Sequence, residues 1–238
     1  MSRMFPFITM TWNPFTGPCP YECTYCWAKN LINRYKWPKY ITAEPGIDEK
    51  QINKTFKPTD FVFVQDMSDA STAHFEAVSR VMLRIETNPD TKFLFLVKNP
   101  SCYLEWIKSD ETRPPKNTIL GATIETNDSA LINQFSKAPP PNNRLHDLYE
   151  LTKLGFKTFV SIEPVMNFDL EQFYRSLYLL DPWAVAIGYD NYHNNLPEPP
   201  LSKVRVLIAK LEMEGIKVYK KTLRESLASK NDGLRRDE

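Results

Sequence analysis

Short apolar runs that are rich in β-branched and aromatic residues recur along the chain. Each run is nearly continuously apolar rather than alternating, which is typical of strands buried on both faces of a parallel sheet. The six clearest runs are Phe7–Trp12, Phe61–Gln65, Lys92–Val97, Thr118–Ile124, Lys157–Ile162 and Trp183–Gly188. A further run, Ile216–Tyr219, is a candidate for an additional edge strand.

Segments with helical periodicity separate these runs. Within 201–214, apolar residues recur at the i, i+3, i+4, i+7 spacing of one buried helix face. The other predicted helices are Thr24–Tyr35, Ser71–Glu86, Leu145–Leu154 and Leu170–Leu180. Alternation of strands and helices predicts an α/β fold with right-handed crossovers. Because six clear strands are fewer than eight, a partial barrel of parallel strands with helices outside fits better than a closed one.

The length of 238 residues suits one domain of this kind. We predict one partial-barrel domain over residues 1–225 and a charged, disordered tail over residues 226–238. A formal net charge of +1 provides no global field that would attract a polyanion, so composition neither implies nor excludes nucleic acid. No run approaches the ~20 apolar residues that span a bilayer, and Met1–Thr11 lacks the features of a signal peptide. We therefore expect a soluble, cytoplasmic protein without membrane partners.

Three of the four cysteines fall within eight residues, directly after the first predicted strand. Cys19, Cys23 and Cys26 have C-x3-C-x2-C spacing, and three thiolates can hold three corners of a 4Fe–4S cluster. Complete protein ligation of such a cluster takes four cysteines, and Cys102 lies far downstream. If Cys102 stays away, one iron is left open for a small molecule. Cys102 could then be a hydrogen donor to a substrate radical, a ligand to a second site, or an ordinary buried thiol. We favour the ordinary buried thiol.

The alternative is a zinc site built from the three cysteines and one of His74, His146 or His193. Closed zinc sites usually contain two pairs of ligands, and this sequence has no second pair. A non-catalytic binding module stabilised by zinc or by a cluster stays open as the second hypothesis.

The run C-x3-C-x-aromatic-C, with Tyr25 as the aromatic residue, resembles the signature of the radical S-adenosylmethionine (radical SAM) superfamily. The flanking motifs are similar to those of a phage- and archaea-associated radical SAM family of unassigned function. These motifs are Thr11-Trp12-Asn13-Pro14, Ser68-Asp69, Lys98-Asn99-Pro100 and Ser161-Ile162-Glu163-Pro164.

The resemblance implies a partial (β/α)6 TIM-like barrel and an oxygen-sensitive 4Fe–4S cluster on Cys19, Cys23 and Cys26. It also implies reductive cleavage of S-adenosylmethionine to a 5′-deoxyadenosyl radical, which abstracts hydrogen from a substrate. A reductant such as ferredoxin or flavodoxin would be required.

The resemblance also assigns cofactor contacts to polar residues at the strand ends. Asp66 and Ser68 would bind the methionine amino group, although Asp66 and Asp69 could instead cap the helix that begins near Ser71. Thr123 and Glu125 would contact the ribose hydroxyls. Tyr25 would place its ring against the adenine, or else pack in the core.

Arg144 would pair with the methionine carboxylate or, alternatively, lie on the surface. Lys98 would meet a carboxylate or phosphate, or reach solvent. Ser161 and Glu163 end the fifth strand, where a buried carboxylate requires a partner. Asp190 and Tyr189, after the sixth strand, are further candidates for substrate or adenine contacts.

The sequence does not identify the substrate. The segment 34–40 interleaves basic and aromatic side chains, as single-strand nucleic-acid binders do. Nucleic acid or a nucleotide is therefore one candidate substrate. The favoured alternative is that this segment is a solvated helix end without a binding role.

Overall fold

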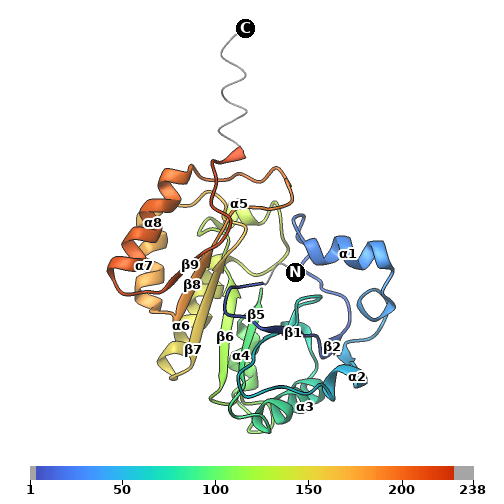
Figure 1. Cartoon of the computed structure of the whole chain (residues 1–238). Coiled ribbons are helices and arrows are strands. Elements are labelled where there is room, and N and C mark those ends of the chain that lie inside the picture. Colours follow the sequence, from blue (N-terminus) through green and yellow to red (C-terminus); the bar gives the residue numbers. More distant parts are fainter. Residues whose placement is uncertain (1–3, 228–238) are drawn as a thin grey trace.

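Within residues 4–227, which the computed structural model describes, seven parallel strands form one sheet (Figure 1). Their spatial order follows their order in the chain, and β1 and β9 form the two edges. The strands are β1 (Met10–Trp12), β4 (Phe61–Val64), β5 (Lys92–Val97), β6 (Thr118–Thr123), β7 (Lys157–Ile162), β8 (Ala184–Ile187) and β9 (Val218–Lys220). The predicted α/β partial barrel is confirmed, including the additional edge strand.

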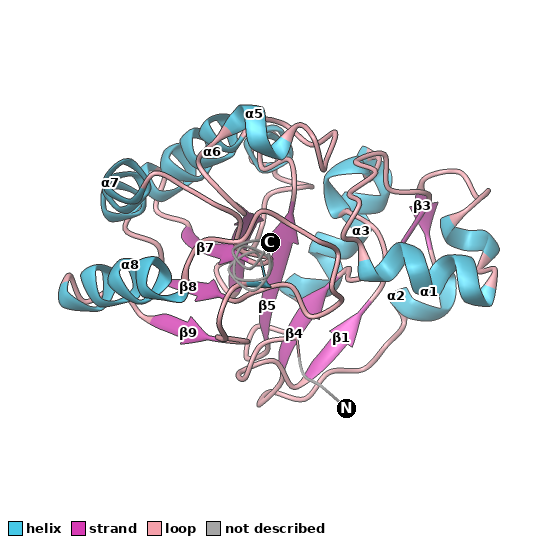
Figure 2. Cartoon of the chain, turned by 90° about the horizontal axis from the view of Figure 1, so that it is seen from above, coloured by secondary structure: helices cyan, strands magenta, loops and turns pink. Residues whose placement is uncertain are grey.

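Helices cover the convex face of the sheet. Figure 2 shows the strands as an arc with α6, α7 and α8 along its outer side. The helices on this face are α3 (Phe75–Glu86), α4 (Ser101–Trp106), α6 (Pro141–Lys153), α7 (Leu170–Leu180) and α8 (Leu201–Met213). Alternate strand residues, such as Val62 and Val64, join these helices in the main core. The predicted helices thus form where their apolar stripes meet the sheet.

The concave face is filled at one end by the N-terminal segment. Phe5 and Phe7 pack among the inward-facing residues of the strands, and the rings of Phe5 and Phe159 lie 5.0 Å apart, edge to face. Phe7 contacts Trp183 at 5.4 Å between ring centroids. The predicted first strand therefore begins at Met10 rather than Phe7, because the rings before it close the floor of the half-barrel.

The connection between β1 and β4 contains structure that periodicity did not predict. A small antiparallel sheet pairs β2 (Phe15–Thr16) with β3 (Gly46–Ile47), and α2 (Glu49–Ile52) follows. Helix α1 (Trp27–Tyr35) begins three residues later than predicted, with Cys26 at its N-cap. These short elements surround the segment that carries the cysteines.

Two other helix starts differ from the prediction, and the first is that of α6, which begins at Pro141 rather than at Leu145. The helix expected from Ser71 is divided into a 3₁₀ turn, η2 (Ala70–Thr72), and α3, which begins at Phe75. The loops contain another 3₁₀ turn, η1 (Pro38–Tyr40), and the short helix α5 (Ser129–Ile132). The predicted disordered tail, 226–238, begins too early, because Ser226 is buried and Leu227 N donates to Glu198 Oε2 at 2.9 Å. The rest of this tail, after residue 227, lies outside the described residues, so its disorder stays a prediction.

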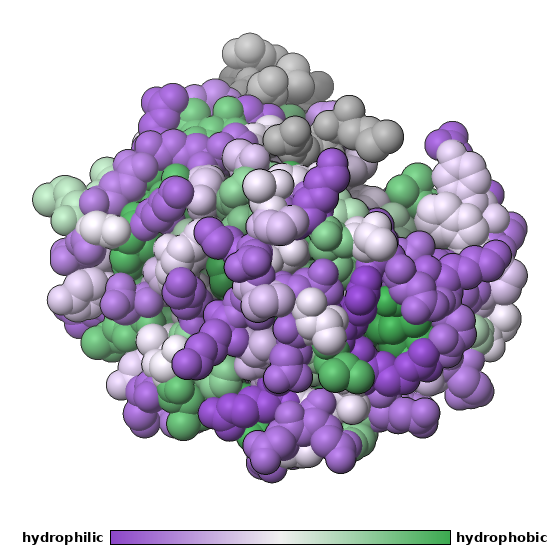
Figure 3. Space-filling view, turned by 60° about the horizontal axis from the view of Figure 1, so that its bottom comes forward, coloured by the Kyte–Doolittle hydropathy of each residue, from purple (hydrophilic) through white to green (hydrophobic). Residues whose placement is uncertain are grey.

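The described part of the chain contains no helix that is long and apolar enough to cross a membrane. The face seen in Figure 3 is mostly hydrophilic, and its hydrophobic areas are small and separated.

Gly121 provides a test of the packing inside the sheet. A Cβ atom at this position would lie 2.9 Å from the carbonyl oxygen of Phe95 and 3.1 Å from that of Phe159. Because backbone atoms of two neighbouring strands cannot yield cheaply, we expect Gly121→Ala to lower the free energy of unfolding by about 1–3 kcal/mol. Urea denaturation followed by circular dichroism measures this. Gly46→Ala is the control, since its nearest atom would be Thr16 Oγ1 at 3.5 Å. Equal stability of the two variants would contradict the prediction.

Candidate functional site

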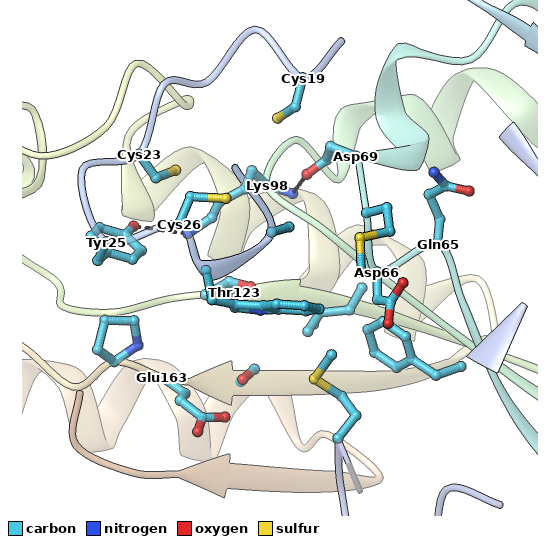
Figure 4. A pocket seen from close by; sticks show the side chains of 18 of the residues that line it. Cys19, Cys23, Tyr25, Cys26, Gln65, Asp66, Asp69, Lys98, Thr123 and Glu163 are labelled. Atoms are coloured by element: carbon cyan, nitrogen blue, oxygen red, sulfur yellow. Dashed lines mark hydrogen bonds between the residues drawn. The ribbon is translucent and has the colours of Figure 1, made fainter. Parts of the chain in front are cut away.

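A cavity of about 420 Å³ lies at the carboxyl ends of the strands (Figure 4). Parallel strands present their carboxyl ends at one edge, where active sites of barrels form. Ten of the twelve residues predicted from the sequence line this cavity: Cys19, Cys23, Tyr25, Cys26, Asp66, Ser68, Lys98, Thr123, Ser161 and Glu163. The fold therefore brings together side chains from the cysteine segment and from four strand ends.

The cysteine segment is fastened to the loop after α5. Thr24 N donates to Phe135 O at 2.9 Å, and Lys137 N donates to Tyr21 O at 2.8 Å. Cys23 Sγ lies 3.2 Å from Ser136 Oγ. Backbone bonds on both sides of Cys23 thus fix the path of the segment.

All three cysteines line the same cavity, and Figure 4 shows their sulfur atoms beside the same space. Cys19 is exposed, Cys26 is half-buried and Cys23 is buried. Among the described residues, no three or more His, Cys, Asp or Glu side chains close on a point where one metal ion would be held.

Cys102 is buried in the main core on α4 and is not among the residues that line the cavity. This position agrees with an ordinary buried thiol.

A buried ion-pair network lies behind the wall of the cavity. Glu125 is 0% exposed, and its Oε2 accepts from Arg144 Nη1 at 2.9 Å. Its Oε1 accepts from Lys98 Nζ and from the Tyr25 hydroxyl. Arg144 also donates from Nη1 to Thr123 O at 2.8 Å. One carboxylate therefore connects the cysteine segment, the ends of β5 and β6, and helix α6.

This network corrects two of the predicted positions. Glu125 was expected at the ribose and Arg144 at the methionine carboxylate, but neither lines the cavity. Arg144 is 0% exposed, so the surface alternative also fails. The two side chains are buried and neutralise each other, because an isolated buried charge is strongly unfavourable.

The network stays ionised although it is buried. Burial opposes the charged form of Glu125, but Lys98 and Arg144 outweigh it and lower the pKa of Glu125 to about 2. Burial also opposes the charge on Lys98, yet the Glu125 carboxylate raises the pKa of that ammonium group. The pKa of Tyr25 is raised by burial and by Glu125, so its hydroxyl remains a donor.

Asp66 and Asp69 have different roles at the end of β4. Asp66 Oδ1 accepts from Asn13 Nδ2 at 2.7 Å, while Asn13 Oδ1 accepts from Asp66 N at 2.8 Å. Asp69 caps η2 through Ser71 N and accepts from Lys98 N at 2.8 Å. The capping alternative thus holds for Asp69 and not for Asp66. Burial raises the pKa of both carboxyl groups.

Ser68 also lies at this strand end. Its hydroxyl accepts from Gln65 Nε2 at 2.6 Å, and Gln65 itself lines the cavity. Gln65 lies at the end of a predicted strand, but its apolar neighbours gave no reason to select it as a site residue.

The opposite side of the cavity is formed by the ends of β7, β8 and β9. Glu163 pairs with Lys221 at 2.6 Å, which supplies the partner that its burial requires. Lys221 was not predicted, because it lies 58 residues from Glu163 and belongs to no motif. The carboxylate of Asp190 accepts from the backbone of Tyr192 and Asn194, so it shapes its own loop.

The basic and aromatic segment 34–40 lies at the end of α1. Tyr35 is 58% exposed and stacks on Trp37, with 5.4 Å between ring centroids. The stack therefore joins an exposed Tyr35 to a half-buried Trp37, and neither ring lines the cavity.

Comparisons with known proteins agree with this fold. The sequence model of the family "Protein of unknown function (DUF5131)" matches residues 4–173. No curated protein matches the sequence.

Solved structures with the same fold include SuiB from Streptococcus suis bound to S-adenosylmethionine, with a TM-score of 0.56 and 10% identity. The match covers 91% of this chain and 50% of SuiB. Spore photoproduct lyase with bound AdoMet and dinucleoside spore photoproduct matches with a TM-score of 0.55 and 13% identity, over 85% of this chain and 60% of the lyase. This chain thus spans about half the length of the first and three fifths of the second. At these identities the likeness shows a shared fold, and it agrees with the partial barrel expected from the sequence.

Glu125→Gln tests the buried network. Glutamine leaves two buried cations without their counterion, so we expect a loss of unfolding free energy on the order of 3 kcal/mol at pH 7. The folded pKa of Glu125 is lowered from 4.5 to about 2. The stabilisation is therefore fully present above pH 4.5 and is lost as the pH falls toward 2.

Urea denaturation of both proteins across this pH range measures the difference. Glu171→Gln is the control, because this residue forms an exposed pair with Lys210 and should cost less than about 1 kcal/mol. A pH-independent difference, or one no larger than that of the control, would refute the role of the network.

Proposed function

The chain belongs to the protein family DUF5131, whose function is unknown, and we propose that it is a radical SAM enzyme. The observation that carries this proposal is the meeting of Cys19, Cys23 and Cys26 with strand-end polar residues in one cavity. Related folds bind S-adenosylmethionine in two different enzymes. A 4Fe–4S cluster on the three cysteines, reduced by ferredoxin or flavodoxin, would supply the electron that cleaves S-adenosylmethionine to methionine and a 5′-deoxyadenosyl radical, which abstracts hydrogen from the substrate.

The protein's own residues would bind and orient the cosubstrate. Each cysteine must lose its proton to become a ligand, so cluster binding releases protons. Asp66, held in place by Asn13, would accept from the methionine ammonium group, with Ser68 beside it. Thr123 would face the ribose. In these assignments, Glu125 and Arg144 do not contact the cosubstrate, and their ion pair stabilises the wall of the cavity.

The floor of the cavity would protect a reactive intermediate. Phe5, Phe63 and Leu96 line it and provide no hydrogen-bonding groups from their side chains. An apolar floor limits the access of water and of competing reactions. Tyr25, anchored to Glu125, would hold the cysteine segment against this cavity.

A nucleic-acid substrate is the second candidate. It is favoured by the stack of the exposed Tyr35 on the half-buried Trp37, beside Arg34 and Lys36, which form no ion pair within residues 4–227. The related folds include a lyase with a bound dinucleoside and SuiB with a bound precursor peptide. Structural similarity alone therefore does not distinguish a nucleic-acid substrate from a peptide substrate. Retention on a single-stranded oligonucleotide column that weakens with salt would support this candidate, and no retention at low salt would exclude it.

The non-catalytic module differs from the enzyme in its affinity for the cosubstrate. Such a module would contain metal but would not bind S-adenosylmethionine. Titration of S-adenosylmethionine into the reconstituted protein, followed by the EPR signal of the reduced cluster, distinguishes the two.

Replacement of a cysteine tests the cluster site. We expect anaerobically reconstituted Cys23→Ala to lose the brown absorbance and the release of 5′-deoxyadenosine upon reduction with dithionite in the presence of S-adenosylmethionine. Cys102→Ala should retain both, because Cys102 does not line the cavity. Normal release by Cys23→Ala, or its loss only in Cys102→Ala, would refute the assignment.

Asp66→Asn tests the methionine contact. Loss of a charge-assisted hydrogen bond is worth about 1.5–3 kcal/mol, so we expect the Kd for S-adenosylmethionine to rise at least about tenfold. The iron content should not change, since Asp66 is not a proposed ligand. EPR titration measures the Kd, with Asp110→Asn, on the exposed surface, as the control. An unchanged Kd in Asp66→Asn would contradict this contact.

A further inference from the structure

The cavity has two chemically different ends. The cysteines, Asp66 and Ser68 belong to the segments that follow β1 and β4. Glu163 and Lys221 follow β7 and β9, and Figure 4 places Glu163 across the cavity from Cys19. If the cofactors occupy the cysteine end, as proposed above, the end formed by β7 to β9 is left for the substrate.

At the end of the cavity formed by β7 to β9, two oppositely charged side chains form an ion pair across the end of the middle strand, β8. Glu163 and Lys221 flank β8, and their side chains meet at 2.6 Å with only 18% of each exposed. Gly188 directly follows β8, and a Cβ there would lie 3.0 Å from Lys221 Cβ and 3.6 Å from Glu163 Oε1. The absence of a side chain at Gly188 therefore lets the pair form across the strand end and face the cavity.

The pair retains unused hydrogen-bonding capacity. Glu163 Oε2 accepts from Lys221, whereas Oε1 has no hydrogen-bond partner among the described residues. Lys221 Nζ donates one hydrogen bond within the same residues and lies 4.9 Å from the centroid of the Phe5 ring. An ammonium group carries three donors. A free acceptor therefore lies beside free donors in the cavity.

The Glu163–Lys221 pair carries no net charge, and the Asp190 carboxylate, which also lines this end, is engaged by the backbone of its own loop. A singly charged ligand would leave one member of the pair without compensation in a poorly hydrated place, which is costly. A zwitterion would bring two further charges into the same place, and the desolvation of both opposes its binding. An uncharged ligand can lie alongside the intact pair and use Oε1 and the remaining ammonium hydrogens.

We infer that the Glu163–Lys221 pair is a substrate-recognition site for an uncharged group that carries a hydrogen-bond donor beside an acceptor. An amide or lactam edge, such as that of a nucleobase, has this arrangement. Glu163 accepts from the N–H of the ligand, and Lys221 donates to its carbonyl oxygen. Glu163 is thereby assigned to the substrate rather than to the cofactor.

The test uses two probes that differ in one donor. Isothermal titration of the reconstituted holoenzyme with S-adenosylmethionine present compares 1-methyluracil, which has a ring N–H between two carbonyls, with 1,3-dimethyluracil, which lacks it. Loss of one hydrogen bond to a charged group corresponds to about a tenfold or greater weakening. We expect the wild type to bind 1-methyluracil at least about tenfold more tightly, and Glu163→Ala to bind both probes within about twofold.

Two further variants complete the design. Lys221→Met should weaken both probes, because each retains a carbonyl acceptor. Glu171→Gln removes a carboxylate from an exposed pair elsewhere and should leave the discrimination of the wild type unchanged. Circular dichroism and iron content check that every variant is folded and loaded.

This assignment would be overturned if the wild type bound the two probes equally, or if it showed no saturable binding of 1-methyluracil. Unchanged discrimination in Glu163→Ala would overturn it as well. So would tighter binding of zwitterionic L-alanine than of 1-methyluracil by the wild type. Release of 5′-deoxyadenosine is measured in parallel. Its absence in the wild type would refute the radical activity, whereas its presence together with equal probe binding would refute only the ligand class.

Discussion

The cavity depends on one buried carboxylate. Glu125 holds Lys98, Arg144 and Tyr25 at the same point, and these residues come from β5, α6 and the cysteine segment. Each cation would be unfavourable alone in this place, so removal of the carboxylate would affect all three. Because Tyr25 lies between Cys23 and Cys26, its hydrogen bond to Glu125 acts together with the backbone hydrogen bonds of this segment to position two proposed cluster ligands.

The open sheet imposes a second constraint. A half-barrel leaves its concave face uncovered by helices, and the aromatic side chains of Phe5 and Phe7 fill it from the amino-terminal end of the strands. The carboxyl-terminal end then remains hollow and is lined by polar strand ends. The two edge strands, β1 and β9, do not pair with each other. The hollow is thus bounded by a floor, a sheet and loops rather than by a closed ring.

The sequence predicted what depends on local pattern. The apolar runs gave every strand of the large sheet, because strands buried on both faces have a composition that short segments reveal. The cysteine spacing and the strand-end motifs gave ten residues that line the cavity. Position at a strand end, however, does not determine what a side chain contacts, and so Glu125 and Arg144 were assigned to the cavity although they form a buried pair and do not line it. Lys221 and the role of Gly188 depend on contacts between strands far apart in the chain, which local pattern does not contain.

The family match ends at residue 173, before β8 and β9 begin. The cysteines, Asp66, Glu125 and Glu163 all lie inside the matched region, whereas Gly188 and Lys221 lie outside it. The two members of the Glu163–Lys221 pair therefore come from segments far apart in the chain, and they meet only when β9 has joined β8 at the edge of the sheet. Displacement of this edge strand would leave Glu163 without its counterion at the cavity wall.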